Sequence, residues 1–80
     1  MTRSLFSPAN GRLREWLIAA RRERKLTQIL LAATLGRPQS FVSKYERGER
    51  RLDFVEVLEI AKALDANTCE LAIEVGRALR

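Results

Sequence analysis

Apolar residues recur every three or four positions along nearly the whole of this 80-residue chain. Leu13, Trp16, Leu17 and Ala20 show this spacing near the start of the chain. A helix places such residues on one face because it turns once in about 3.6 residues. No stretch alternates between polar and apolar residues for long enough to predict a strand. The spacing therefore predicts an all-α fold.

Residues that start and stop helices divide the chain into five predicted helices. Ser7, Thr27, Asp53 and Asn67 each precede an apolar run and can cap its first turn. Gly36 is placed to end one helix in a left-handed conformation, and a second glycine follows residue 47. We predict helices over residues 8–24, 28–35, 37–47, 53–64 and 68–80, in a single domain over 8–80 that follows a flexible segment over 1–7.

The same spacing predicts which side chains face the core. In the second and third helices these are Leu31, Ala32, Leu35, Val42 and Tyr45. In the fourth and fifth helices the predicted inward residues are Phe54, Val57, Leu58, Ala61, Leu64, Leu71, Val75 and Leu79.

Charge is distributed unevenly along the chain, whose formal net charge is +5. Residues 1–51 contain 12 basic and four acidic residues, a net charge of +8. Residues 52–80 contain three basic and six acidic residues, a net charge of −3. A basic first part joined to an acidic second part indicates that one surface meets a polyanion.

Composition excludes several classes of protein. One cysteine and no histidine argue against a disulfide scaffold, a zinc module and a histidine-dependent hydrolase. No acidic pair stands in an apolar setting, so we expect neither an enzyme nor a cofactor or metal site. The longest apolar runs have five residues, far short of the roughly 20 that span a bilayer. We therefore expect no membrane partner and a cytoplasmic location.

Two short helices separated by one tight, glycine-containing connection occupy residues 28–47. This is the pattern of a helix-turn-helix, with basic and amide side chains on its second helix. A helix fits the roughly 12 Å major groove of B-DNA, whereas the deep, narrow major groove of A-form RNA excludes it. Double-stranded DNA is therefore the favoured polyanion.

Several segments, in order, resemble one family of helix-turn-helix proteins. They are Leu26-Thr27-Gln28, Leu31-Ala32, Leu35-Gly36, Gln39-Ser40, Val42 to Gly48 and Ile60 to Leu64. The chain is similar, over roughly residues 13–71, to the phage repressor and Cro type, also called the xenobiotic-response-element family. The resemblance implies a five-helix domain, often dimeric, that binds operator DNA and regulates transcription.

The resemblance implies that the third helix is the recognition helix. Gln39, Ser40, Ser43 and Lys44 would then lie at or near base edges. Their chemistry agrees, because glutamine can pair bidentately with adenine, lysine can donate to guanine, and serine can serve either way. Phosphate contacts would come from residues that position the protein without reading sequence. They are Gln28, Arg47, Arg50 and Arg51.

The resemblance also implies one structural pair and points to departures from the usual pattern. Arg21 and Glu46 hold positions where the family commonly joins helix one to helix three by an ion pair. Pro38 replaces the usual capping hydroxyl of helix three, and Lys25 replaces a usual glycine. The third departure is apolar residues at Ile29, Leu30 and Phe41, which we hypothesise are covered by Leu5 and Phe6 or by a partner protein.

The fifth helix, over residues 68–80, is the predicted dimer face. Leu71, Ile73, Val75 and Leu79 would complete the core or form a two-fold interface that sets two recognition helices about 34 Å apart. We predict a homodimeric repressor on a short pseudo-palindromic operator. Two alternatives stay open: an antitoxin that holds a small protein partner, and a cofactor that bridges proteins in transcription.

Overall fold

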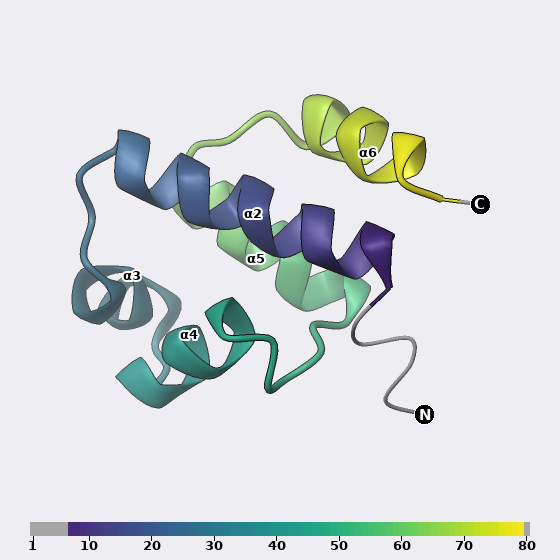
Figure 1. Ribbon diagram of the computed structural model, residues 1–80. Helices are drawn as coiled ribbons and strands as arrows, with labels where there is room; N and C mark the ends of the chain where they lie inside the picture. Colours follow the sequence, from purple (N-terminus) through teal and green to yellow (C-terminus); the bar gives the residue numbers. More distant parts are fainter. Residues whose placement is uncertain (1–6, 80) are drawn as a thin grey trace.

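The computed structural model describes residues 7–79, and within them the chain forms five helices and no strand (Figure 1). This confirms the all-α prediction. The other residues, among them Leu5 and Phe6 and most of the predicted flexible segment, lie outside the described part. The helices are α2 (Pro8–Glu23), α3 (Gln28–Leu35), α4 (Gln39–Glu46), α5 (Phe54–Ala63) and α6 (Thr68–Arg77).

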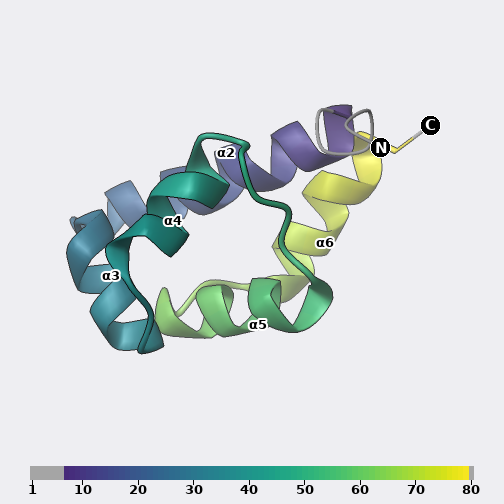
Figure 2. The same ribbon diagram turned by 90° about the horizontal axis from the view of Figure 1, so that it is seen from below.

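α2 crosses the middle of the molecule, with α6 on one side and the α3 and α4 pair on the other (Figure 1). α5 packs against α3, so the chain runs around a common centre (Figure 2). Side chains from all five helices and from the ends of their loops fill that centre. The largest fully buried side chains are Leu17, Leu31, Val42, Tyr45, Ile60 and Leu64.

Four of the five helices begin at the capping side chain that the sequence predicts. Ser7 accepts from the amide of Asn10, so it belongs to α2 as its cap. Thr27 and Asn67 cap α3 and α6, and Asp53 forms a complete capping box with Glu56. Each cap satisfies amide groups that the first turn of a helix leaves without a carbonyl partner.

α4 is the exception among these helices. Its cap residue is Pro38, which offers no side-chain hydrogen bond, so α4 begins at Gln39, slightly later than predicted. The preceding helix, α3, ends at Gly36, whose φ of 68° is left-handed. Lys25 adopts a similar φ of 56° after α2, at the position where the resemblance implies a glycine. Local backbone hydrogen bonds close the end of α2, where the amides of Lys25 and Leu26 donate to the carbonyls of Arg22 and Arg21.

The predicted inward face of α5 is partly wrong. Phe54 is 75% exposed and Leu58 is 39% exposed, whereas Ile60 is fully buried. α5 carries apolar residues on more than one face, so spacing alone allows more than one orientation. Packing against α3 turns Ile60 and Ala61 inward, and Phe54 stands at the helix start, where it does not enter the core.

α6 is shorter than predicted. It ends at Arg77, and Leu79 lies beyond its last turn with 68% of its surface exposed. Leu71 is buried in the core, and Val75 packs partly against it. Only the first part of the predicted stripe therefore faces α2.

A buried ion pair joins α2 to α4, as predicted. Arg21 Nε lies 2.7 Å from Glu46 Oε2, and Arg21 Nη2 lies 3.0 Å from Glu46 Oε1. Arg21 Nη1 donates to the carbonyl of Leu26 at 2.7 Å. The two side chains are only 11% and 6% exposed. The hydrogen bond to Glu46 raises the pKa of Arg21, so the guanidinium stays charged.

Replacing Glu46 with alanine is expected to lower the free energy of unfolding by about 3–5 kcal/mol, because Arg21 would stay buried and charged without its carboxylate. Urea unfolding followed by circular dichroism measures the change. Glu49→Ala is the matched control, since the Glu49 side chain is 55% exposed. Its effect should be much smaller, because water screens the ion pair that Glu49 makes with Arg47. Equal stability of the two variants would show that the pair does not hold α4.

Candidate nucleic-acid interface

Three of the four residues predicted to contact bases lie on the solvent side of α4. Gln39, Ser40 and Lys44 are exposed, on the side of the helix opposite the core. Ser43 is only 9% exposed, and its hydroxyl accepts a hydrogen bond from Arg47 Nη1 at 2.7 Å. The structure therefore turns Ser43 away from the surface that the other three share.

A relay of hydrogen bonds runs from the core to this surface. Gln39 Nε2 donates to Gln28 Oε1 at 2.8 Å, and Gln28 Nε2 donates to Glu46 Oε1 at 2.8 Å. Glu46 is the carboxylate that pairs with Arg21. The relay thus links α2, α3 and α4 through four side chains. The sequence predicted roles for all four residues but not the bonds from Gln28 to Glu46 and Gln39.

The relay sets the direction of both amides. The Glu46 carboxylate can only accept, so the Gln28 amide nitrogen must face it and the Gln28 oxygen must face Gln39. Gln39 then uses one amide hydrogen on Gln28. Its oxygen and its second amide hydrogen stay available, so Gln39 presents one acceptor and one donor at the surface of α4.

A tight turn follows α4 and begins the loop that carries three of the predicted phosphate contacts. Gly48 is buried and has a left-handed φ of 77°. A Cβ added there would lie 3.2 Å from Cζ of Arg14, which packs over the turn. Glycine is thus required both by the backbone conformation and by the close approach of Arg14.

Arg47 and Arg51 are exposed beside α4. Arg47 donates to both carboxylate oxygens of Glu49, at 2.9 and 3.1 Å, and this lowers the pKa of the Glu49 carboxyl. Both side chains of that pair are more than half exposed, so water screens it. Arg47 can therefore exchange Glu49 for another anion at small cost.

Arg50 occupies a different environment from the one predicted. Its guanidinium donates to both oxygens of Glu56, at 3.0 and 2.9 Å, and lies over the ring of Phe41, 4.8 Å from its centroid. Arg37 lies over the same ring at 4.4 Å and donates to Glu56 at 3.2 Å. Arg50 therefore holds Phe41 and Glu56, while 39% of its side chain stays exposed.

The same cluster accounts for Phe41, which the sequence left as a large residue in need of a cover. Phe41 is 7% exposed because Arg37 and Arg50 stack on it. Ile29 and Leu30 differ from Phe41, with 66% and 52% of their surfaces exposed on α3.

Two of the four residues predicted as a dimer face, Leu71 and Val75, line one groove, whereas Ile73 lines a different hollow and Leu79 is exposed beyond α6. Leu71 is buried in the core, and Ile73 lines a hollow with Arg12 and Trp16. Val75 instead lines an apolar groove of about 200 Å³ between α2, α5 and α6. The groove is lined by Leu13, Phe54, Val57, Leu58, Thr68, Leu71, Ala72 and Val75.

Between residues 7 and 79, no three His, Cys, Asp or Glu side chains gather in a way that could hold a metal ion. None of the helices in that range is long and apolar enough to cross a bilayer.

The sequence predicted only a local role for Glu56, as part of the capping box at the start of α5. Hydrogen bonds from Arg50 and from the backbone of Asp53 lower the pKa of its carboxyl from 4.5 to about 2. In the unfolded chain the carboxyl has its ordinary pKa. Its contribution to stability is therefore complete above about pH 4.5 and is lost as the pH falls toward 2.

We expect Glu56→Gln to remove this part of the acid sensitivity, because glutamine does not titrate but can still accept the capping-box bond. Urea unfolding of both proteins, at pH values from about 4.5 down to 2, measures the difference. The free energies of unfolding should converge as the pH falls. A constant difference across this range would contradict the assignment.

Most of these helices lie within a region that matches a known protein family. A family model described as helix-turn-helix matches residues 17–71, from the middle of α2 to the first turn of α6. A search of curated proteins found no significant match. The match spans more than half of the chain and contains α3, α4 and the loop after them. This chain belongs to the Cro/C1-type helix-turn-helix family of DNA-binding domains.

Proposed function

We propose that this protein is a sequence-specific repressor of transcription that binds a short operator with α4 in the major groove. The observation that carries the proposal is the relay from Arg21 through Glu46 and Gln28 to Gln39. It holds a donor and an acceptor at fixed positions on an exposed helix, which is what reading a base edge requires.

The three exposed residues of α4 supply complementary base chemistry. The free oxygen and free amide hydrogen of Gln39 match the N6 donor and N7 acceptor of adenine. Lys44 can donate to O6 and N7 of guanine, and Ser40 can donate or accept. Each good contact contributes about 1–3 kcal/mol of discrimination against the wrong base.

Phosphate contacts position α4 in this proposal. The side-chain amide of Gln28 has a second hydrogen that can donate to a phosphate. The Thr27 hydroxyl caps α3 by accepting from the backbone amide of Leu30. The backbone amides of Gln28 and Ile29 therefore stay available at the start of α3. Arg47 and Arg51 are exposed at the end of α4 and in the loop after it. These groups would hold the backbone of the duplex beside the recognition helix.

Gln39→Ala should relax the preference at one base pair per half-site by about 1–3 kcal/mol, because its base contact is lost. Arg51→Ala should instead weaken binding to all sequences alike and flatten the salt dependence by about one unit, because it removes one phosphate contact. Selection of bound sequences from a random duplex pool, followed by salt titration of the best site, measures both effects.

An unchanged sequence profile for Gln39→Ala would refute the proposed recognition surface. Binding without salt dependence or sequence preference would favour the alternative of a protein-bridging cofactor. Ser43→Ala is the control within α4, since Ser43 is buried and bonded to Arg47. Its sequence profile should match that of the wild-type protein.

We further propose that the protein binds its operator as a homodimer through the apolar groove between α2, α5 and α6. Phe54 and Leu58 stand exposed at this groove, and Leu13, Val57 and Val75 line it. An exposed aromatic side chain beside an apolar groove on the same face can serve both halves of a two-fold contact. This places the interface on α5 as much as on the predicted helix α6.

Phe54→Glu should give a monomer of unchanged stability, because the side chain is 75% exposed in the single chain and a charge would oppose the contact. Ile73→Glu is the control, since Ile73 is 55% exposed but lines a different hollow. Sedimentation equilibrium of both variants measures the effect. If Ile73→Glu is monomeric and Phe54→Glu remains dimeric, the groove is not the interface, and the exposed side of α6 is.

Ile29 and Leu30 favour a second candidate function. Both are more than half exposed on α3, next to Gln28, and no described side chain covers them. We propose that they are the docking residues if the protein is an antitoxin that holds a small protein partner. A purified complex in which that partner slows hydrogen exchange of the α3 backbone amides around both residues would distinguish this candidate.

A further inference from the structure

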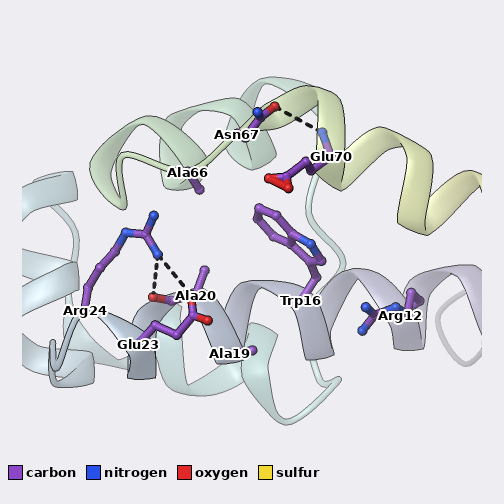
Figure 3. Close-up of a pocket in the computed structure, with 9 residues that line it drawn as sticks. All are labelled: Arg12, Trp16, Ala19, Ala20, Glu23, Arg24, Ala66, Asn67 and Glu70. Atoms are coloured by element: carbon purple, nitrogen blue, oxygen red, sulfur yellow. Dashed lines mark hydrogen bonds and ion pairs between the residues drawn. The ribbon is translucent and has the colours of Figure 1, made fainter.

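A cavity of about 330 Å³ lies between α2 and the start of α6 (Figure 3). Its lining residues come from α2, from the loop before α6 and from the first turn of α6, and none belongs to α3 or α4. Ala19, Ala20 and Ala66 line it with small side chains, which leaves the space open. The volume lies at the lower end of the range that binds small molecules.

Trp16 and Glu70 line the cavity away from Arg24, with Arg12 beyond them (Figure 3). Glu70 is the third residue after the cap of α6, as Glu56 is in α5. Glu56 bonds back to the amide of its cap residue at 3.0 Å, but Glu70 makes no such bond among the described residues. Its carboxylate lies beside the Trp16 ring at the cavity (Figure 3). A carboxylate next to an aromatic ring suits an ammonium group.

The opposite end of the cavity is formed by Arg24 (Figure 3). Its guanidinium donates to the carbonyl of Ala20 at 3.1 Å and to the carbonyl of Asp65 at 3.0 Å, so it is held in place. These bonds use two of its five N–H groups. Glu23 also lines the cavity, but its ion pair with Arg24 is long, at 3.6 Å, and its side chain is 77% exposed, so water screens it. Arg24 can therefore still bind a carboxylate.

A second hollow, of about 280 Å³, continues along Trp16. It shares Arg12, Trp16 and Glu70 with the first cavity and adds Ile73 and Glu74. The indole ring and Ile73 give it an apolar wall. The charged residues of the hollow are Arg12 and Glu74, which pair with each other at 3.2 Å, and Glu70, so an uncharged group would lie against the indole ring and Ile73.

We propose that the cavity binds a free α-amino acid with an apolar side chain. Its ammonium group binds Glu70 beside the Trp16 ring, and its carboxylate binds Arg24. Its side chain lies along Trp16 toward Ile73. The Glu70 carboxylate and the Arg24 guanidinium together favour a zwitterion over a simple amine or a simple acid. None of the lining residues belongs to α4, so the site is separate from the proposed DNA-binding surface.

Calorimetric titration of the whole chain with L-leucine, L-isoleucine and L-methionine tests the proposal, with the fluorescence of the single tryptophan as a second readout. We expect saturable binding of at least one amino acid and a matching change in Trp16 emission. Isoamylamine and isocaproate, which are leucine without its carboxylate and without its amino group, should each bind about tenfold more weakly or not at all.

Glu70→Gln should weaken binding about tenfold or more, because the ammonium group loses its charged partner. Glu59→Gln is the matched control, since Glu59 lies on α5 and outside both hollows, and it should bind as the wild-type protein does. Circular dichroism checks that both variants fold. No heat with any of the three amino acids at millimolar concentration, equal binding of isoamylamine and leucine, or equal affinity of the two variants would each overturn the proposal.

Discussion

The buried pair of Arg21 and Glu46 is the contact on which the position of α4 depends. Two bonds from Arg21 and one from Gln28 satisfy the Glu46 carboxylate. A carboxylate in that position must keep its partners, since a buried unpaired charge is costly. The pair therefore fixes the angle between α2 and α4, and through Gln28 it also fixes the amide that α4 presents to solvent at Gln39. Stability and the proposed recognition of DNA share one set of hydrogen bonds.

A second cluster holds α4 from its other side. Phe41 packs under the guanidinium groups of Arg37 and Arg50, and Glu56 at the start of α5 accepts from both. Because α4 has a proline at its cap, these tertiary contacts hold its start in place of a capping hydroxyl. The cluster also shows that basic charge in the first part of the chain has two uses. Some arginines hold the fold together, and a smaller set stays available for an anion.

The sequence predicts those features of the structure that depend on residues close together in the chain, and it predicts less well those that depend on distant residues. The starts of α2, α3, α5 and α6 were predictable because a cap and the amide that it satisfies lie two or three residues apart. The Arg21 and Glu46 pair was predictable only through family resemblance, since 25 residues separate its members. The orientation of α5 and the position of Arg50 were not predictable. α5 is apolar on more than one face, so the spacing does not select the buried one. Nothing in the sequence distinguishes an arginine that is free in solvent from one that pairs with Glu56.

The sequence by itself determined that the chain is all-helical, where most helices begin and end, and which short helix carries the exposed amide and lysine. These properties depend on interactions between residues within about one helical turn of each other. Only the tertiary structure decided that Ser43 turns inward, that Arg50 serves Phe41 and Glu56, and that Gln28 links Glu46 to Gln39. The physical reason is that a charged or amide side chain can be satisfied equally well by water, by a ligand or by a distant residue. Packing of the helices determines which of these partners is within reach.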